Sequence, residues 1–318
     1  MRIREALSRG ASVLSGTGSE SPYLDASILL ALALACGRSA LLARHSDALP
    51  AEAESAFFSL LARRAEGESI AYILGEKEFF GRSFHVGPGV LVPRPETEIL
   101  VEAALLTARR ILHNRGAGTP PAAYPPRRPG PNDAPGCGQG LALRVHDAFT
   151  GSGCVGVTLA AELPDAEVSL SDLSATARDL ASRNAREILG RDLPVLESDI
   201  LSGAPGPYDL ITANPPYVDS ARTDRLSGTQ GTPGADGIRW EPRMALDGGA
   251  DGLTFYRSLV PEAEKRLVPG GGLVVEIGEE QAAAVEALFR SGGFLDVEVI
   301  RDLGGRDRVV RGLRHEGN

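Results

Sequence analysis

The stretch Asp147-Ala148-Phe149-Thr150-Gly151-Ser152-Gly153-Cys154-Val155-Gly156 decides the fold class of this chain. It lies between the apolar run Leu141–Val145, expected to form a strand, and the apolar pattern Val155–Leu163, expected to form a helix. Its glycines at positions 151, 153 and 156 let the backbone turn tightly and approach a ligand closely, at the positive end of that helix. The stretch therefore predicts a strand, a ligand-binding loop and a helix in succession.

Downstream of this stretch, short apolar runs alternate with helical patterns. Strands are expected at Leu141–Val145, Glu167–Leu170, Tyr208–Thr212 and Leu273–Ile277, and helices at Val155–Leu163, Ala175–Leu189, Leu253–Leu267 and Gln281–Arg290. Such alternation is typical of an α/β fold whose mostly parallel sheet is covered by helices on both faces. Ligands of such sheets bind outside the carboxyl ends of the strands, so we expect the strand-end residues to carry the chemistry.

Residues 1 to about 80 show a different pattern, in which apolar residues recur at helical spacing. We expect a small all-α domain there, then a connecting hairpin and helix over residues 81–113, and the α/β domain over residues 141–318. Residues 114–140 contain seven prolines and six glycines, a composition that favours a flexible insertion. Residues 227–239 also bear glycine and proline and are expected to form a second, solvent-exposed insertion.

The composition excludes several classes of protein. The chain has 318 residues, 42% of them hydrophobic and 24% charged, which argues against collagen, a long coiled coil or a wholly disordered chain. No apolar run reaches the roughly 20 residues that span a bilayer, and no apolar leader follows Met1. We therefore expect a cytoplasmic protein that does not bind membranes.

Charge and cysteine content narrow the partners further. The net charge of −9 repels a phosphate backbone, so general nucleic-acid binding is not expected. The three cysteines are widely spaced and odd in number, which fits neither a disulfide framework nor a zinc site. The histidines His85, His113 and His146 have no companion at metal-ligand spacing. We expect no metal site, and we expect a monomer.

The strand that follows the glycine loop ends at Ser171-Asp172. A carboxylate at this point can accept hydrogen bonds from the hydroxyls of a ribose. With the glycine loop, Asp172 indicates a site for an adenine nucleotide or nucleoside, the alternative being a structural turn beside a surface aspartate. These two elements alone do not distinguish a dinucleotide from S-adenosylmethionine.

Asn214-Pro215-Pro216-Tyr217 follow the strand expected at Tyr208–Thr212. The two prolines stiffen the loop and donate no backbone hydrogen bond, so the Asn214 carbonyl and main-chain oxygens dominate it. Two acceptors can take both hydrogens of a planar NH2 group while the tyrosine ring stacks against its plane. Held in this way, a poorly nucleophilic amide nitrogen can direct its electron density at an electrophile such as a sulfonium methyl group, without a strong base. An ordinary rigid turn is the alternative.

At these residues the chain resembles the class I methyltransferases that modify NH2 groups, whose (N/D/S)-P-P-(Y/F/W) motif residues 214–217 match. It is similar in particular to the peptide chain release factor glutamine N5-methyltransferases of the HemK type. Further stretches carry this narrower resemblance: Val92–Glu98, Trp240–Gly249 with Asp251–Leu253, Leu273–Gly278 and Arg301–Val310. The resemblance implies a class I, Rossmann-like seven-stranded sheet preceded by a small helical domain. It also implies S-adenosylmethionine as cofactor and methyl transfer to a glutamine N5 in a release factor.

The resemblance also implies roles for individual residues. The methionine part of the cofactor is wrapped by Phe149, Thr150, Gly151, Ser152 and Gly153, its ribose is bound by Asp172, and its adenine lies along Asp199 and Ile200. Asn214 contacts cofactor and substrate amide, and Pro215, Pro216 and Tyr217 complete the glutamine pocket, with Asn214, Pro215 and Tyr217 as the catalytic residues. The chain departs from the family at two of these positions. Phe149 stands where a small residue is frequent, and Ile200 replaces an aromatic residue of some members.

Three other functions stay open at the level of the sequence. A nucleic-acid amino-methyltransferase would use the same pocket, because the NH2 group of adenine or guanine is also planar, although it usually needs a basic groove. A nicotinamide-dependent dehydrogenase could use the glycine loop but leaves residues 214–217 unexplained. The third is a catalytically silent domain that binds the release factor or ribosome through its helical region.

Overall fold

The computed structural model describes residues 1–116, 142–228 and 237–315. The chain divides into two units, each of which is described by itself. The helical unit comprises residues 1–77, 86–92 and 221–243, and the sheet unit comprises residues 78–85, 93–220 and 244–318. The predicted insertions at 114–140 and 227–239 lie largely outside the described residues, as does Leu141 of the first expected strand.

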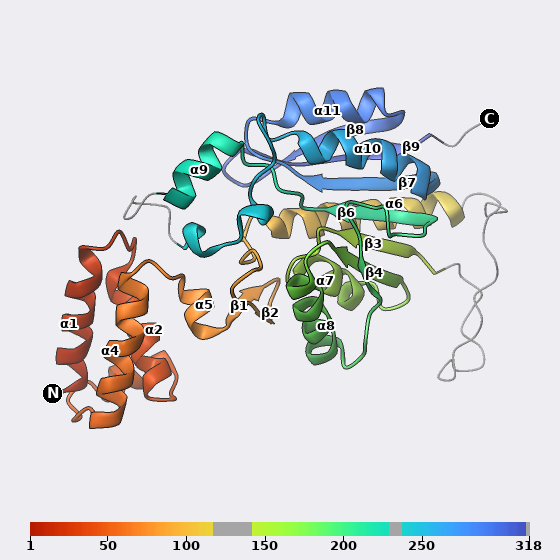
Figure 1. Cartoon of the computed structure of the whole chain (residues 1–318). Helices are drawn as coiled ribbons and strands as arrows, with labels where there is room; N and C mark the ends of the chain where they lie inside the picture. The colour runs from red at the N-terminus through yellow and green to blue at the C-terminus, as the bar shows by residue number, and fades with distance from the viewer. Residues whose placement is uncertain (117–141, 229–236, 316–318) are drawn as a thin grey trace, which may run out of the picture. The chain divides into compact units, whose positions relative to one another are not determined.

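The N-terminal helices of the helical unit form a bundle (Figure 1), and they pack around a core of their own. The bundle is formed by α1 (Ile3–Ser15), α2 (Pro22–Ala33), α3 (Arg38–Ala43), α4 (Ala51–Ala65) and α5 (Ile70–Leu74). Ile3, Leu7 and Leu14 lie on one face of α1 and are buried because their spacing follows the helical repeat. The small N-terminal helical region predicted from the sequence is confirmed.

The sheet unit contains one seven-stranded sheet in the order β5-β4-β3-β6-β7-β9-β8. The strands are β3 (Arg144–Ala148), β4 (Glu167–Asp172), β5 (Val195–Glu197), β6 (Tyr208–Ala213), β7 (Leu267–Glu276), β8 (Phe294–Arg301) and β9 (Asp307–Arg314). The five strands from β5 to β7 run parallel, and β9 is antiparallel to both β7 and β8. Strand order reverses between β3 and β6, so their carboxyl ends form the switch point at which such sheets bind ligands.

Helices cover both faces of this sheet (Figure 1). One face packs against α6 (Thr97–Gly116), α7 (Cys154–Glu162) and α8 (Ala175–Leu189), and the other against α10 (Thr254–Arg266) and α11 (Ala282–Ser291). Successive strand residues alternate between the two cores, because side chains along a strand point to opposite faces. Thus Leu210 lies in the first core and Ile211 in the second. The predicted α/β fold, with helices on both faces, is confirmed.

The four helices and four strands expected in this region are present, with shifts at their ends. The largest shift is in β7, which begins at Leu267 and not at 273, because Leu267 pairs with Tyr208 before an irregularity in the register. The remaining described elements are the hairpin strands β1 (Glu76–Phe79) and β2 (Arg82–His85), the helix α9 (Ser220–Gly228) and two short 3-10 helices at Ile238–Trp240 and Arg243–Ala245. Within the described ranges, every helix is too short or too polar to cross a bilayer.

Candidate active site

The glycine loop is fastened to the sheet by Asp147, a buried carboxylate near the end of β3. Its Oδ2 accepts hydrogen bonds from the Thr150 hydroxyl at 2.6 Å and the Gly156 amide at 3.1 Å. Its Oδ1 accepts one from the Thr212 hydroxyl of β6 at 2.7 Å. Burial raises the pKa of Asp147 to about 6, while these donors favour its ionised form. Asp147 is not among the site residues predicted above, although its place as a strand-end acid directly before the glycines is a signal for this role.

The loop itself adopts the left-handed backbone conformation at Phe149, Gly151 and Gly153, with φ of 56°, 54° and 82°. At Gly153 an added Cβ would lie 3.1 Å from Cα of Ala181, so a larger residue would meet both strain and crowding. A left-handed phenylalanine is strained, which explains why a small residue would suit position 149. The Phe149 ring packs edge-on against Phe255, at 5.4 Å between centroids.

Asp172, the last residue of β4, joins the neighbouring strand end to this loop. Its Oδ2 accepts the Gly151 amide and its Oδ1 accepts the Ser174 amide, each at 2.9 Å. Burial raises the pKa of Asp172, and the two amides counteract this. Each carboxylate oxygen keeps a second lone pair, so Asp172 can still accept ligand hydroxyls.

Asp199 and Ile200 follow β5, next to β4 in the sheet. Asp199 is exposed, whereas Ile200 is half-buried against the core that α10 and α11 share with the sheet. The Ser198 hydroxyl donates to the Ile200 carbonyl at 3.1 Å and holds Ile200 at a φ of 56°. Ile200 thus presents an aliphatic surface where an aromatic ring would offer stacking.

Asn214-Pro215-Pro216-Tyr217 continue from β6 at the switch point. Ala213 and Ala148 are paired across β6 and β3, so Asn214 and Phe149 leave the sheet on adjacent strands. Pro215 and Pro216 are buried, and Asn214 and Tyr217 are half-buried. The Asn214 Nδ2 donates to the Thr97 hydroxyl at 3.4 Å, at the start of α6.

The loop at residues 246–252 and the side chain of Gln281 contact the backbone of this motif. The Gly248 amide donates to the Val218 carbonyl at 2.7 Å, and Gln281 Nε2 donates to the Tyr217 carbonyl at 2.9 Å. At Gly252, where φ is 71°, an added Cβ would lie 2.3 Å from the Tyr217 carbonyl oxygen. The backbone at the end of the motif is therefore fixed by close packing that only glycine permits.

Glu276, the last residue of β7, lies buried beside the motif. Its Oε1 accepts the Tyr217 hydroxyl at 3.2 Å, and its backbone carbonyl accepts the Tyr256 hydroxyl at 2.8 Å. Burial raises the pKa of Glu276 to about 7 and also raises that of Tyr217. Glu276 lies in the stretch Leu273–Gly278, which carries the family resemblance, but it is not among the predicted site residues.

The structure thus places every predicted site residue at or just beyond the carboxyl end of β3, β4, β5 or β6 in the sheet unit. Two buried acids, Asp147 and Glu276, add to the predicted set. The described residues contain no group of three or more His, Cys, Asp or Glu side chains that could hold a metal ion.

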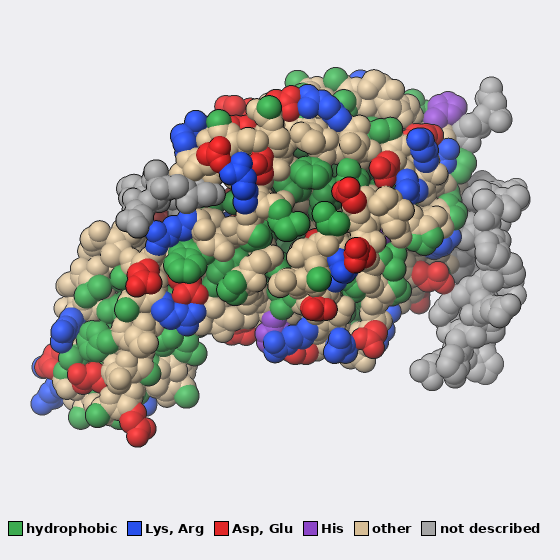
Figure 2. Space-filling model, viewed as in Figure 1, with side chains coloured by type: hydrophobic (Ala, Val, Ile, Leu, Met, Phe, Trp, Pro, Cys, Tyr) green, Lys and Arg blue, Asp and Glu red, His purple; other side chains and the backbone are tan. Residues whose placement is uncertain are grey.

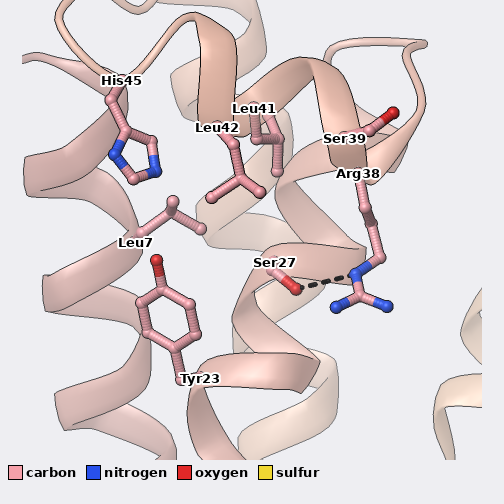
Figure 3. A pocket seen from close by; sticks show the side chains of 8 residues that line it. All are labelled: Leu7, Tyr23, Ser27, Arg38, Ser39, Leu41, Leu42 and His45. Atoms are coloured by element: carbon pink, nitrogen blue, oxygen red, sulfur yellow. Dashed lines mark hydrogen bonds between the residues drawn. The ribbon is translucent and has the colours of Figure 1, made fainter.

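A separate pocket lies within the helical unit, on α1, α2, α3 and the turn that follows α3 (Figure 3). Leu7, Leu41 and Leu42 form its apolar wall, with Tyr23 and His45 beside them. At one side the Arg38 Nε donates to the Ser27 hydroxyl at 3.1 Å. This pocket contains none of the predicted catalytic residues.

A glycine loop and a strand-end acid beside an acceptor-rich Asn-Pro-Pro-Tyr loop, on this sheet topology, define a class I methyltransferase. Models of the PrmC N-terminal domain and the methyltransferase small domain match residues 5–75 and 138–229. The release factor glutamine methyltransferase of Moorella thermoacetica is 37% identical over 99% of this chain and 100% of its own. The Burkholderia pseudomallei protein of that name is 40% identical over 91% of each chain. The chain belongs to the release factor glutamine methyltransferase family.

Comparison with solved structures supports the fold. The hMettl16 catalytic domain, solved in complex with the MAT2A 3'UTR hairpin 6, has a TM-score of 0.52 to this chain. The sequences are 16% identical, and the likeness covers 81% of this chain and 82% of that one. At this identity the two proteins share a fold, and the likeness says nothing of a shared substrate.

Proposed function

We propose that this protein transfers a methyl group from S-adenosylmethionine to the side-chain amide nitrogen, N5, of a glutamine in peptide chain release factors. The observation that carries the proposal is the placement of Asn214 at the switch point. Asn214 follows β6, which lies beside β3 and its glycine loop, and β4, which ends at Asp172, lies on the other side of β3. Relatives that align with nearly the whole chain are release factor glutamine methyltransferases.

The residues present fit S-adenosylmethionine. The loop from Phe149 to Gly153, left-handed at positions 149, 151 and 153, is assigned to the methionine part, and Asp172 keeps lone pairs for the ribose hydroxyls. The exposed Asp199 and the aliphatic face of Ile200 suit the adenine. When bound, the cofactor supplies an electrophilic methyl group on a sulfonium sulfur.

The protein's own contribution is to hold the substrate amide. Pro215 and Pro216 lack N–H groups, so main-chain oxygens and Asn214 Oδ1 are the groups that can accept both amide hydrogens. The Tyr217 ring, fixed by its hydrogen bond to Glu276, closes one side of the pocket. Alignment of a bound nucleophile can contribute on the order of 7–11 kcal/mol in favourable cases, so no strong base is required.

A protein substrate suits the surface better than a nucleic acid. The net charge is −9, and Lys and Arg side chains are interspersed with Asp and Glu on the face shown in Figure 2. A pocket for one planar amide cannot tell one glutamine-bearing protein from another, so recognition needs further surface. We assign that recognition to the helical unit, and we propose that the protein acts as a cytoplasmic monomer without general nucleic-acid binding.

The test is incubation of the purified protein with methyl-labelled S-adenosylmethionine and either a release factor or total RNA. Label in the release factor, located at a glutamine N5 by mass spectrometry of its peptides, is the expected result. Label in the RNA would instead establish a nucleic-acid amino-methyltransferase. Absence of label in both, with the cofactor bound, would establish a silent binding protein.

A further inference from the structure

Asn184, on α8, is a fully buried polar side chain that joins two separate segments of the sheet unit. Its Oδ1 accepts the backbone N–H of His85 at 2.8 Å, and its Nδ2 donates to the His85 carbonyl at 3.0 Å. The same Nδ2 donates to the carbonyl of Ser152, in the glycine loop, at 2.7 Å. One amide therefore connects the last residue of β2 to the glycine loop.

The chemistry of these partners fixes the orientation of the amide. An N–H group donates and a carbonyl oxygen accepts, so Oδ1 must face the His85 N–H and Nδ2 must face the two carbonyls. The reversed amide would place Oδ1 against two carbonyl oxygens and leave these backbone groups without partners, which is costly. The backbone of His85 thus determines which way Asn184 turns, and the remaining hydrogen of Nδ2 holds the Ser152 carbonyl.

The face of α8 that bears Asn184 also packs closely on the glycine loop. Ala181 lies three residues before Asn184, so the two side chains share this face. An added Cβ at Gly153 would lie 3.1 Å from Cα of Ala181. Helix α8 therefore fixes two successive residues of the loop, Gly153 by close contact and Ser152 by a hydrogen bond.

His85 has a second connection to α8, through its side chain. Its Nε2 lies 2.5 Å from Glu187 Oε2, and Glu187 Oε1 accepts from Arg183 Nε at 2.8 Å. The Glu187 side chain is half-exposed, so solvent competes for it, and both partners named here lie outside the glycine loop. The connection that continues from β2 into the loop is the buried one, through Asn184.

We propose that Asn184 is a positioning residue for S-adenosylmethionine: its amide, oriented by His85, keeps the Ser152 peptide in the conformation that the cofactor requires. The proposal rests on the proposed function for the assignment of residues 149–153 to the cofactor. Asn184 is fully buried, so it acts through Ser152. Because one amide bonds both segments, a cofactor that orders the loop also orders the end of β2, and the coupling is reciprocal.

The first experiment is calorimetric titration of S-adenosylmethionine into the native, Asn184→Ala and Asn184→Leu proteins, at a temperature where circular dichroism shows each to be folded. We expect Asn184→Ala to raise the Kd about tenfold, the effect of one lost hydrogen bond. Asn184→Leu fills the place of the amide without donating, so it should raise the Kd at least as much. At saturating cofactor, kcat should change less than about threefold, because the loss concerns cofactor binding.

Two substitutions on the same helix are the controls. Glu187→Ala loosens the side chain of His85 but leaves Asn184 in place, and Ala185→Gly destabilises α8 without removing a side-chain hydrogen bond. Both should keep the native Kd. A native Kd in both Asn184 variants would overturn the inference, as would an equal rise in the Ala185 variant, which would show that any loosening of α8 has this effect.

A second measurement uses the native protein alone. Hydrogen exchange of the His85 amide, followed by NMR, should slow on saturation with S-adenosylmethionine more than exchange of the Phe80 amide. Phe80 lies in the turn of the same hairpin, and its amide donates to Glu98 Oε1 of α6 at 2.8 Å. General stabilisation by a bound ligand slows both amides alike, so equal slowing would overturn the inference.

These readouts separate the inference from the proposed function. The Kd and the exchange rates are measured without a protein substrate. A native protein that binds S-adenosylmethionine but labels no release factor overturns the proposed methyl acceptor, and the role of Asn184 is still decided by the two binding measurements.

Discussion

The helical unit and the sheet unit bury charged groups in opposite ways. In the helical unit, the Asp25 carboxylate accepts hydrogen bonds from Arg64 Nε and from the Ser19 hydroxyl, each at 2.8 Å. All partners of this buried ion pair named here therefore belong to the same unit. In the sheet unit, Asp147, Asp172 and Glu276 lie at strand ends, where their partners belong to the loops around the site. The buried ion pair stabilises the helical unit, whereas the buried acids of the sheet unit hold the loops of the ligand site in place.

The largest expected effect comes from breaking the buried ion pair of the helical unit. Removing one partner of a buried ion pair leaves an unpaired charge and costs about 3–5 kcal/mol. We expect Arg64→Ala to lower the free energy of unfolding of this unit by that amount. Denaturant unfolding followed by fluorescence of Trp240, the single tryptophan, measures it in the unit concerned.

Arg63→Ala is the control for this prediction. Arg63 is on the same helix and pairs with Glu68 at 2.6 Å, but 43% of its side chain is exposed. Such pairs are worth about 0–1 kcal/mol. Equal losses from the two variants would mean that the Asp25–Arg64 pair contributes no more than a surface pair.

The next effect concerns chemistry in the sheet unit. We expect Asn214→Ala to lower kcat about 100-fold or more while cofactor affinity is largely kept, since an aligned acceptor matters most in the transition state. Single-turnover methylation of a release factor and calorimetric titration with S-adenosylmethionine separate the two quantities. Near-native turnover would show that the loop is only a rigid turn.

Asp172→Ala should act on binding instead. It removes the acceptor for the ribose hydroxyls, and a hydrogen bond to a charged group contributes about 1.5–3 kcal/mol. We therefore expect S-adenosylmethionine affinity to fall about 10- to 100-fold by calorimetry. The same titration with NAD is the specificity control, and comparable affinity for NAD in the native protein would overturn the cofactor assignment.

The sequence predicted the strand-loop-helix order and the site residues because these depend on local patterns. Gly151, Gly153 and the two prolines mark positions where the backbone requires that residue type, and Asp172 ends a strand whose apolar pattern is clear. The roles of Asp147 and Glu276 were not predicted, because each depends on partners distant in the sequence. Asp147 bonds Thr212, and Glu276 bonds Tyr217, only once the strands are ordered side by side.

The register of β7 was also beyond local reasoning. Its first residues, Leu267 to Gly270, contain proline and glycine and resemble a turn, yet Leu267 pairs with Tyr208 of β6. The partner strand, and not the propensity of the segment, determines that the strand begins there.

The smallest expected effect tests whether recognition belongs to the helical unit. Leu42 and Tyr23 line its pocket, and these residues are 68% and 52% exposed, which is unusual for large apolar residues that also share a hollow (Figure 3). If the release factor covers them, burial of one leucine contributes about 1.5–3 kcal/mol at most. We expect Leu42→Asp to raise KM for the release factor up to about tenfold, with kcat and cofactor affinity unchanged.

Leu106→Asp is the matched control, because Leu106 is 53% exposed on α6 of the sheet unit. A raised KM in the Leu106 variant, with a native KM in the Leu42 variant, would place recognition on the sheet unit, where the chemistry already is.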